Sequence, residues 1–382
     1  MSVTLPPGCT LRRATAQDNA AILEFQAAHA MRAGLTLRFD RSPQFFNLLR
    51  CHAPQFEVWL LLVGETIGGM ATLVIREGYI DGVAQPVAYI GDLRVAPRRR
   101  LMGLWGPLAV EQLHRLRAAH GVRFAYGCII RGNRLARQSL LRAGAGQRPV
   151  LTPLRGYCNV SLLARKPWVS RRSVPGVAIR RAMPADREPL RAFLDAQSRE
   201  QPFGVVFDHA TFERRMSGWP DFGVESFWLA VEHASGRLLG CLAPWDARAI
   251  RRLIVERPGA ALDALRLAFN GLAPLLGKPR IPVGRQDRSG LADVALTHVS
   301  IAGRRADVFG ALLDAAYREL WRSRRYATVT LCMFDDDPLT PALAPYWSVR
   351  VPMDVYVITA APDPATPISV GAGVPGFEIY LV

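Results

Sequence analysis

The sequence has almost no lysine, no long apolar run and no pattern of a signal peptide in its first residues. Lysine stands only at positions 166 and 278 of 382, so nearly all of the 48 basic residues are arginines. No window holds the roughly 18 uninterrupted apolar residues that a membrane-spanning helix requires. The first residues contain no basic segment followed by an apolar core, so we expect no signal peptide. These absences exclude a membrane helix and favour a cytoplasmic protein.

Paired cysteines are also missing. No CxxC pair occurs, and no histidine stands at ligand spacing from a cysteine, so the sequence predicts neither a disulfide framework nor a metal site. The acidic run 335–337 precedes a proline, and we interpret it as a solvated turn because adjacent carboxylates in a loop point in different directions. The six scattered cysteines are Cys9, Cys51, Cys128, Cys158, Cys241 and Cys332.

The formal net charge of +16 raises the question of a polyanionic partner. Nucleic-acid binders usually gather their basic residues on one face or helix, whereas these arginines are spread along the whole chain, which fits the bias of a GC-rich genome. We therefore expect a solvated basic surface and no nucleic-acid partner. Attraction of anionic ligands, such as a phosphorylated cofactor or an acidic acyl carrier protein, is the alternative.

The chain repeats itself at an offset of 168 residues. "LRRATAQD" at 11–18 matches "IRRAMPAD" at 179–186, and in each copy the final aspartate is a candidate N-cap for an amphipathic helix. "RFD" at 38–40 matches "VFD" at 206–208 at the same offset. Such self-similarity predicts a tandem duplication, with domains at 1–165 and 177–382 joined by the Pro-, Ser- and Arg-rich linker 166–176.

Each unit reads as strands and helices in one order, so the predicted fold class is α/β (α+β), with a mixed sheet and helices on both faces. The first unit has strands near 11–14, 56–63, 67–76, 86–95, 122–130 and 156–163, and helices near 18–31, 42–51, 103–120 and 133–143. The second unit inserts a helix within 256–276 before its fourth strand at 291–301. A helix at 308–322 and a strand at 326–334 follow, then an irregular tail at 362–376 and a short strand from 377.

The stretch 91–116 carries the strongest functional signal. An extended apolar segment ends at Pro97, three arginines follow, and an amphipathic helix begins near Gly103. Proline ends the strand because it cannot donate to the sheet. The first N–H groups of a helix have no partner within it, and together with the helix dipole they favour a diphosphate. A basic surface turn is the alternative reading of the three arginines.

In element order and in two motifs, the first unit resembles the GCN5-related N-acetyltransferase (GNAT) superfamily. The family's acyl-CoA motif, Q/R-x-x-G-x-G/A after Val-x-Pro, corresponds to residues 100–105 after Val95, and "NRLA" at 133–136 corresponds to its N-x-x-A segment. The resemblance implies tandem GNAT-like domains. Each is expected to be a mixed, mostly antiparallel sheet splayed between its fourth and fifth strands, with helices on both faces.

The resemblance also implies acetyl-CoA, or another acyl-CoA, as co-substrate. The main chain at Leu93 and Val95 would pair with the pantetheine amides, and Asn133 would bind the same arm. The implied binding residues are Leu93, Val95, Arg98, Arg99, Arg100, Leu101, Met102, Gly103, Leu104, Trp105 and Asn133. Two residues depart from the pattern: Trp105 replaces Gly or Ala, which would bring its ring near the phosphates, and Leu140 replaces a tyrosine that protonates the leaving thiolate.

Two residues are candidates for acid–base catalysis, which needs a proton acceptor within reach of the amine. Asp92, on the fourth strand, is the candidate base, with a cap or a pair with Arg94 as its alternative role. Tyr157 is the candidate acid in place of Leu140, with an aromatic position on a sheet face as the alternative. Cys128 is expected to be a buried thiol. The terminal carboxylate at Val382 could act in the first unit, as in some tandem relatives.

The second unit has lost the motif. Its aligned segment, 306–311, has no leading arginine, and Asp307 places a negative charge where a diphosphate would bind. We expect this unit to be non-catalytic and to shape an acceptor cleft between the units.

The preferred function is N-acyl transfer, most simply acetyl transfer, from the CoA thioester to a small-molecule primary amine by direct attack. The protein would be a monomeric pseudo-dimer of domains or a homodimer, without a membrane partner. The alternative is a non-catalytic protein that senses CoA esters or binds nucleic acid.

Overall fold

The computed structural model describes residues 3–32, 36–97, 99–133, 136, 148–284, 289–360, 373–378 and 381, and of Arg99 and Arg100 the backbone alone. The first half has strands β1 (Cys9–Arg13), β2 (Met31–Arg32), β3 (Thr36–Asp40), β4 (Gln55–Val63), β5 (Thr66–Ile80), β6 (Val83–Val95), β7 (Phe124–Ile130) and β8 (Val150–Arg165). Its helices are α1 (Asn19–Ala28), α2 (Phe46–His52), α3 (Arg99–Met102) and α4 (Trp105–His120).

The second half repeats this order. Its strands are β9 (Val177–Arg181), β10 (Gly204–Val205), β11 (Trp228–Glu232), β12 (Leu238–Trp245), β13 (Arg252–Arg257), β14 (Asp293–Ile301), β15 (Thr328–Phe334) and β16 (Tyr346–Thr359). Its helices are α6 (Arg187–Arg199), α7 (His209–Gly218), α8 (Ala260–Leu272) and α9 (Ala306–Ser323). The predicted helix at 133–143 lies outside the described residues, apart from positions 133 and 136. Residues 373–378 form no regular element.

Both half-sheets splay at the predicted place. In the first half, β6 and β7 pair in parallel at 87–89 with 124–126 and then diverge. In the second half, β14 and β15 pair in parallel at 293–295 with 328–330 and then diverge. We call the spaces beyond these short pairings the first gap and the second gap. The mixed, mostly antiparallel sheet splayed between the fourth and fifth strands of each unit is confirmed.

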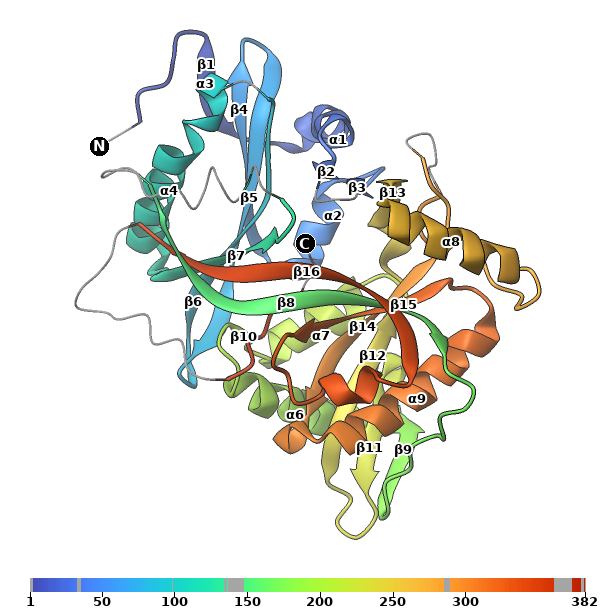
Figure 1. Ribbon diagram of the computed structural model, residues 1–382. Helices are drawn as coiled ribbons and strands as arrows, with labels where there is room; N and C mark the ends of the chain where they lie inside the picture. Colours follow the sequence, from blue (N-terminus) through green and yellow to red (C-terminus); the bar gives the residue numbers. More distant parts are fainter. Residues whose placement is uncertain are drawn as a thin grey trace.

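The two halves share one continuous sheet, because their last strands are exchanged. Within the described ranges the strand order is β1-β4-β5-β6-β7-β16-β8-β15-β14-β12-β11-β9. β16, from the second half, pairs with β7 of the first, while β8, from the first half, pairs with β15 of the second. Figure 1 shows β8 and β16 side by side across the centre of the molecule. The division into domains at 165 and 177 stays a prediction, and the sheet crosses it without a break.

The repeated "RRA" segments build the same local structure twice. Asp18 accepts the N–H of Thr15 and both arms of Arg12, at 2.6 and 2.8 Å. Asp186 does the same with Met183 and Arg180. Each aspartate therefore bonds back to the residue three positions earlier, which corrects the expectation that its side chain caps the following helix. The arginine partner also holds the pKa of both carboxyls below their usual range.

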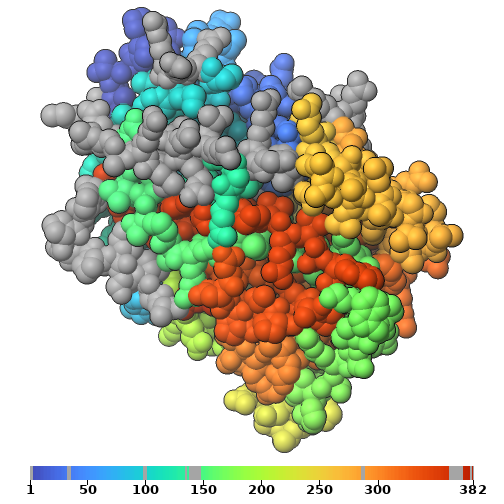
Figure 2. All heavy atoms as spheres, in the orientation of Figure 1, coloured from blue at the N-terminus to red at the C-terminus, as the bar shows by residue number. Residues whose placement is uncertain are grey.

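The predicted insertion is a helix, α8, preceded by a strand that the sequence did not suggest. β13 pairs antiparallel with β3, and β3 pairs with β2, so a small three-stranded sheet joins the two halves. Figure 2 shows this insertion, in gold, on the surface beside β16, in red. Among the described helices, none combines the length and the apolar character needed to cross a bilayer.

Candidate active site

The first gap exposes the main chain of β6. The N–H of Ala96 donates to the carbonyl of Gly68 on β5 at 2.9 Å, and Arg94 lies opposite Met70 in the same ladder. Because main-chain groups alternate between the two sides of a strand, those of Leu93 and Val95 face away from β5, into the gap. These are the two positions predicted to pair with the pantetheine arm.

A β-bulge at Asp92 turns β6 away from β7. The register between β5 and β6 shifts between Met70 and Thr72, and Asp92 has a left-handed φ of 51°. This conformation costs an ordinary residue energy, so the surroundings must hold it. The second half has the matching bulge on β14, where His298 has a φ of 52°.

Asp92 is held by an ion pair with Arg41. The two arms of Arg41 donate to its carboxylate at 2.8 and 3.1 Å, and only 1% of the Arg41 side chain and 7% of the Asp92 side chain are exposed. Gln26 and Thr72 each add a hydrogen bond at 3.3 Å. The alternative partner, Arg94, instead donates to the carbonyl of Leu93 at 3.1 Å, and burial lowers its pKa. Each Asp92 oxygen thus accepts two hydrogen bonds.

Below the bulge lies a largely apolar cavity of about 210 Å³, which we call the donor cavity. Its walls come from β6, β7, α4 and the ends of β8 and β16. Asn133 lines it, its Oδ1 accepts the N–H of Ala136 at 3.1 Å, and its Nδ2 group has no hydrogen-bond partner among the described residues. Further lining residues are Trp59, Leu73, Gly91, Asp92, Leu93, Arg94, Trp105, Leu108, Leu113, Leu116, Cys128, Leu151, Tyr356 and Ile358.

The predicted acyl-CoA motif forms two helices separated by a turn. α3 ends at Met102, residues 103 and 104 form the turn with the N–H of Leu104 donating to Leu101, and α4 begins at Trp105. Gly103 is exposed. Arg98 and the side chains of Arg99 and Arg100 lie outside the described residues, so their contribution of charge stays a prediction.

The Trp105 ring packs inward, against the sheet. It is 7% exposed and joins a cluster with Leu61, Ala71 and Leu101. A Cβ added at Gly69 would lie 2.7 Å from the ring, so β5 has glycine where the tryptophan packs. The missing side chain on β5 gives the ring a place in the core, and the expectation that the ring lies near the phosphates stays a prediction.

Tyr157 is buried and Cys128 is half-buried. Tyr157 is fully buried, packs against Phe334 and Phe377 at centroid distances of 4.9 and 5.1 Å, and lines the cavity of the second gap. This packing favours its alternative role as an aromatic core residue, and its part as a proton donor stays a prediction. Burial raises the pKa of Cys128 well above its usual value, so this thiol is a weak nucleophile. Leu140 and Val382 lie outside the described residues.

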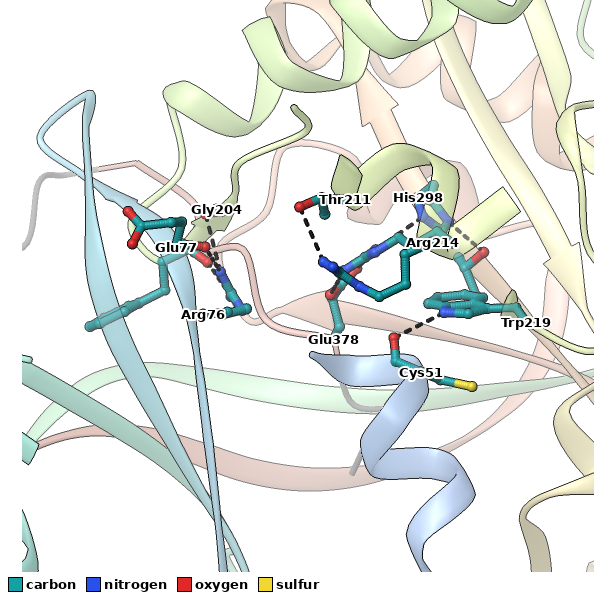
Figure 3. A network of polar contacts seen from close by, with 12 residues as sticks. Cys51, Arg76, Glu77, Gly204, Thr211, Arg214, Trp219, His298 and Glu378 are labelled. Carbon is teal, nitrogen blue, oxygen red and sulfur yellow. Dashed lines mark hydrogen bonds and ion pairs between the residues drawn. The ribbon is translucent and has the colours of Figure 1, made fainter. Parts of the chain in front are cut away.

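The second gap holds the chain's own C-terminal segment. Glu378 pairs with both arms of the buried Arg215 at 2.6 Å, and Arg215 also contacts Nε2 of His298 at 3.0 Å. Figure 3 shows Glu378 and His298 converging in this network. Since guanidinium can only donate, Nε2 accepts, and Nδ1 donates to Thr297 at 2.9 Å. His298 is therefore neutral, and burial lowers its pKa to about 3.

The motif region of the second half is occupied by internal contacts. α9 begins at Ala306, and Asp307 pairs with Arg305 at 2.6 Å. The acidic run 335–337 begins as the expected turn, with Asp335 and Asp336 exposed, but Asp337 is buried. Each carboxylate has an arginine partner: Asp335 pairs with Arg131, Asp336 with Arg155 and Asp337 with Arg304. The described residues include no cluster of metal-ligating side chains.

Some site residues have no signal in the sequence. Arg41 sits 51 positions from Asp92, in a segment that matched the repeat only at the three residues before it. The bulge itself could have been inferred only from its duplication on β14, and the residues there, Asp92 and His298, differ in chemistry. The paired glycines at 68 and 69 were the one cue that a bulky group packs on β5.

Comparisons with known proteins identify the fold. No family model matches the chain, and no curated protein matches it by sequence. The structure is similar to a GCN5-related N-acetyltransferase from Sphaerobacter thermophilus, with a TM-score of 0.59 and 16% identity over 96% of this chain and 100% of that one. It is similar to a tandem GNAT protein from the clavulanic acid biosynthesis pathway, with a TM-score of 0.54 and 14% identity over 93% and 99%.

A third similar structure is the N-myristoyltransferase of Saccharomyces cerevisiae with bound myristoyl-CoA and inhibitors, with a TM-score of 0.58 and 10% identity over 94% of this chain and 81% of that one. These neighbours and the two splayed half-sheets agree: the chain has the tandem fold of the GCN5-related N-acetyltransferase superfamily.

Proposed function

We propose that the protein is an acyl-CoA-dependent N-acyltransferase whose donor binds in the first gap. The observation that carries this proposal is the side of β6 at Leu93 and Val95 that faces away from β5, because no described strand pairs with it beyond residue 89 and Leu93 lines the donor cavity. A pantetheine arm has amides that can complete this edge as a short strand would. The similar structures include N-acetyltransferases and an enzyme with bound myristoyl-CoA.

The donor would be held at three places. Main-chain groups at Leu93 and Val95 would bind the pantetheine amides, and Nδ2 of Asn133 would bind the same arm. The main chain from α3 through Gly103 to the start of α4 would bind the diphosphate, since amides at helix starts favour anions. The exposed Gly103 lets a phosphate approach the backbone closely.

In the reaction, the nitrogen of a neutral amine attacks the thioester carbonyl, the C–N bond forms, and the C–S bond then breaks. Main-chain N–H groups of β6 that face the gap would stabilise the negative oxygen of the intermediate. Asp92 remains our proposed proton acceptor, through a water molecule. Its ion pair with Arg41 gives it a second role, which is to fix the bulge that aims those N–H groups.

The second gap has no part in donor binding in this proposal. Glu378, Arg215 and His298 fill it with the chain's own C-terminal segment, and Asp307 stands at the start of α9. The second half would support the sheet and, through β13 and α8, cover the acceptor. We expect acetyl-CoA as donor, an intracellular location and no macromolecular partner for the reaction.

A thiol-release assay tests the proposal. Acetyl-CoA and longer acyl-CoAs are offered with a panel of primary amines, and free thiol is followed with mass analysis of the amide product. We expect amine-dependent release that Gly103→Asp abolishes, because it places a negative charge at the diphosphate. Gly271→Asp is the matched control, since this glycine of α8 has open space around it. No thiol release with any donor, or equal release by Gly103→Asp, would contradict the proposal.

A further inference from the structure

A second apolar chamber, of about 190 Å³, lies beneath the insertion. We call it the α8 chamber. Its roof is made by β3, β13 and α8, and its floor by β7, β8, β15 and β16, at the centre of the sheet (Figure 1). The apolar side chains around it include Leu37, Phe39, Leu253, Val255, Leu262, Leu265, Phe269, Leu291, Val349, Val351 and Met353.

The α8 chamber adjoins the donor cavity. Met31, Phe39, Cys128 and Ile130 line both spaces. Cys128 and Ile130 belong to β7, the strand that diverges from β6 at the first gap. A molecule in the α8 chamber would therefore lie against the open side of the first gap, where the thioester is proposed to bind.

Arg251 brings a positive charge into this apolar chamber. Its guanidinium lies over the Phe39 ring, 4.0 Å from the centroid, and its Nε is shielded from solvent without a hydrogen-bond partner. In the described part of the chain it forms no ion pair. Burial lowers the pKa of Arg251 to about 10, against the weaker attraction of Asp293. A half-buried guanidinium whose Nε is shielded from water, with no ion pair among the described residues, is costly to the fold.

Three neighbouring arginines are different, because each has a carboxylate partner. Arg252 pairs with Asp40 at 2.8 Å, Arg248 with Asp246 at 2.6 Å, and Arg266 with Asp263 at 2.7 Å. Among the described residues, Arg251 thus differs from these three arginines, because no carboxylate forms an ion pair with it.

Two further polar atoms on the chamber floor have no partner among the described residues. Oγ1 of Thr328 belongs to a side chain that is 3% exposed, and Oδ1 of Asn159 lies on the adjacent strand β8. Buried polar groups in folded proteins are usually hydrogen-bonded, so an unpartnered set around one space indicates a ligand with polar groups of its own. Thr328 can donate a hydrogen bond, and Asn159 can accept one from an amine.

We propose that the α8 chamber binds the acyl acceptor, and that this acceptor is an amine that carries a carboxylate and an apolar body, as an α-amino acid with a large apolar side chain does. The carboxylate would pair with Arg251, the apolar body would pack among Leu253, Leu262 and Phe269, and the amine would face the wall shared with the donor cavity. This inference rests on the proposed N-acyltransferase function and adds the substrate class.

The step is a simple acyl transfer. The amine nitrogen forms the C–N bond with the thioester carbonyl carbon, the C–S bond breaks, and the proton lost by the nitrogen is balanced by the thiol of free coenzyme A. The product is an N-acyl amino acid, in which the carboxylate stays on Arg251. Neither an oxidant nor a metal enters the balance.

The test compares each acid with its neutral analogue. With a saturating acyl-CoA, kcat/KM is measured for leucine and phenylalanine and for their carboxamides, which keep the amine and the apolar body. Because a hydrogen bond to a charged group contributes about 1.5–3 kcal/mol, we expect the acids to be preferred by roughly tenfold to a hundredfold. Glycine, which lacks the apolar body, should be a poor acceptor.

Three variants test whether Arg251 causes the preference for the acids over their carboxamides. Arg251→Met should remove it, Arg251→Lys should keep part of it, and Arg257→Met, at an exposed position on β13, should leave it unchanged. Arg251→Met should also melt at the same temperature as the parent protein or higher, since the lost charge has no ion-pair partner among the described residues. If this variant does not fold, the comparison of acids with carboxamides on the parent protein decides alone.

The outcomes separate the two proposals. If acyl-CoA binds and amines release thiol, but acids and carboxamides react equally or Arg251→Met keeps the preference, the acceptor assignment is wrong and the transferase stands. If no acyl-CoA binds and no amine releases thiol, the transferase proposal itself fails.

Discussion

The ion pair between Arg41 and Asp92 offers the sharpest test of how the first gap is built. Both side chains are almost completely buried, and the pair holds the left-handed bulge that aims Leu93 into the gap. Removing one partner leaves an uncompensated buried charge, which costs about 3–5 kcal/mol. We therefore expect Arg41→Met and Asp92→Asn each to lower the free energy of unfolding by that amount, reduced for Asp92→Asn by its remaining hydrogen bonds.

The double variant Arg41→Met/Asp92→Asn should recover much of this loss, because no buried charge remains. Urea unfolding of the parent, the two single variants and the double variant gives the coupling energy between the two side chains, which we expect to be at least about 2 kcal/mol. The same four proteins are assayed for thiol release. Single variants that lose less than about 1 kcal/mol, or additive losses in the double variant, would refute the idea that this pair holds the bulge.

Two further predictions concern the core. Gly69→Ala should lower stability by about 1–3 kcal/mol, because the added Cβ would lie 2.7 Å from the Trp105 ring; a Tm equal to that of the parent would contradict this packing. Stability should also fall with acid, since burial keeps the pKa of both His52 and His298 near 3. Below pH 6.5 these two histidines take up protons in the unfolded chain but not in the folded chain. Each of them therefore lowers the free energy of unfolding by about 1.4 kcal/mol per pH unit, down to pH 3. His298→Gln should flatten this slope in urea titrations, while the exposed His114→Gln should not.

The order of strands and helices could be predicted from the sequence because the two halves of the chain have similar sequence patterns in the same order. Hydrophobic patterns, Pro97 and the repeated "RRA" segments place strands and helices in both halves, and the splay follows from the family resemblance. The exchange of β8 and β16 could not be predicted. Both strands have patterns that fit either half-sheet, and only long-range pairing decides which neighbour each one takes.

The candidate site also has features that could be predicted from the sequence and features that could not. The orientation of Leu93 and Val95 could be predicted, because strand position and motif determine which main-chain groups face the gap, while their role in binding stays a prediction. Arg41 and Arg251 were missed because one arginine among many gives no signal. The role of Arg41 depends on a carboxylate, Asp92, that is distant in the sequence, and the role of Arg251 depends on the lack of an ion pair among the described residues. The inward packing of Trp105 could not be predicted, because the space that its ring fills is provided by Gly69 on a different strand.

Calorimetric titration of acyl-CoA into the protein tests the central claim most directly. If the main chain around Leu93, Val95 and Gly103 forms the donor site, acetyl-CoA or a longer acyl-CoA should bind with one-to-one stoichiometry. Gly103→Asp should weaken this binding by tenfold or more, while Gly271→Asp should bind as the parent does. Absence of heat with every acyl-CoA at millimolar concentration, or equal affinity in Gly103→Asp, would contradict the account.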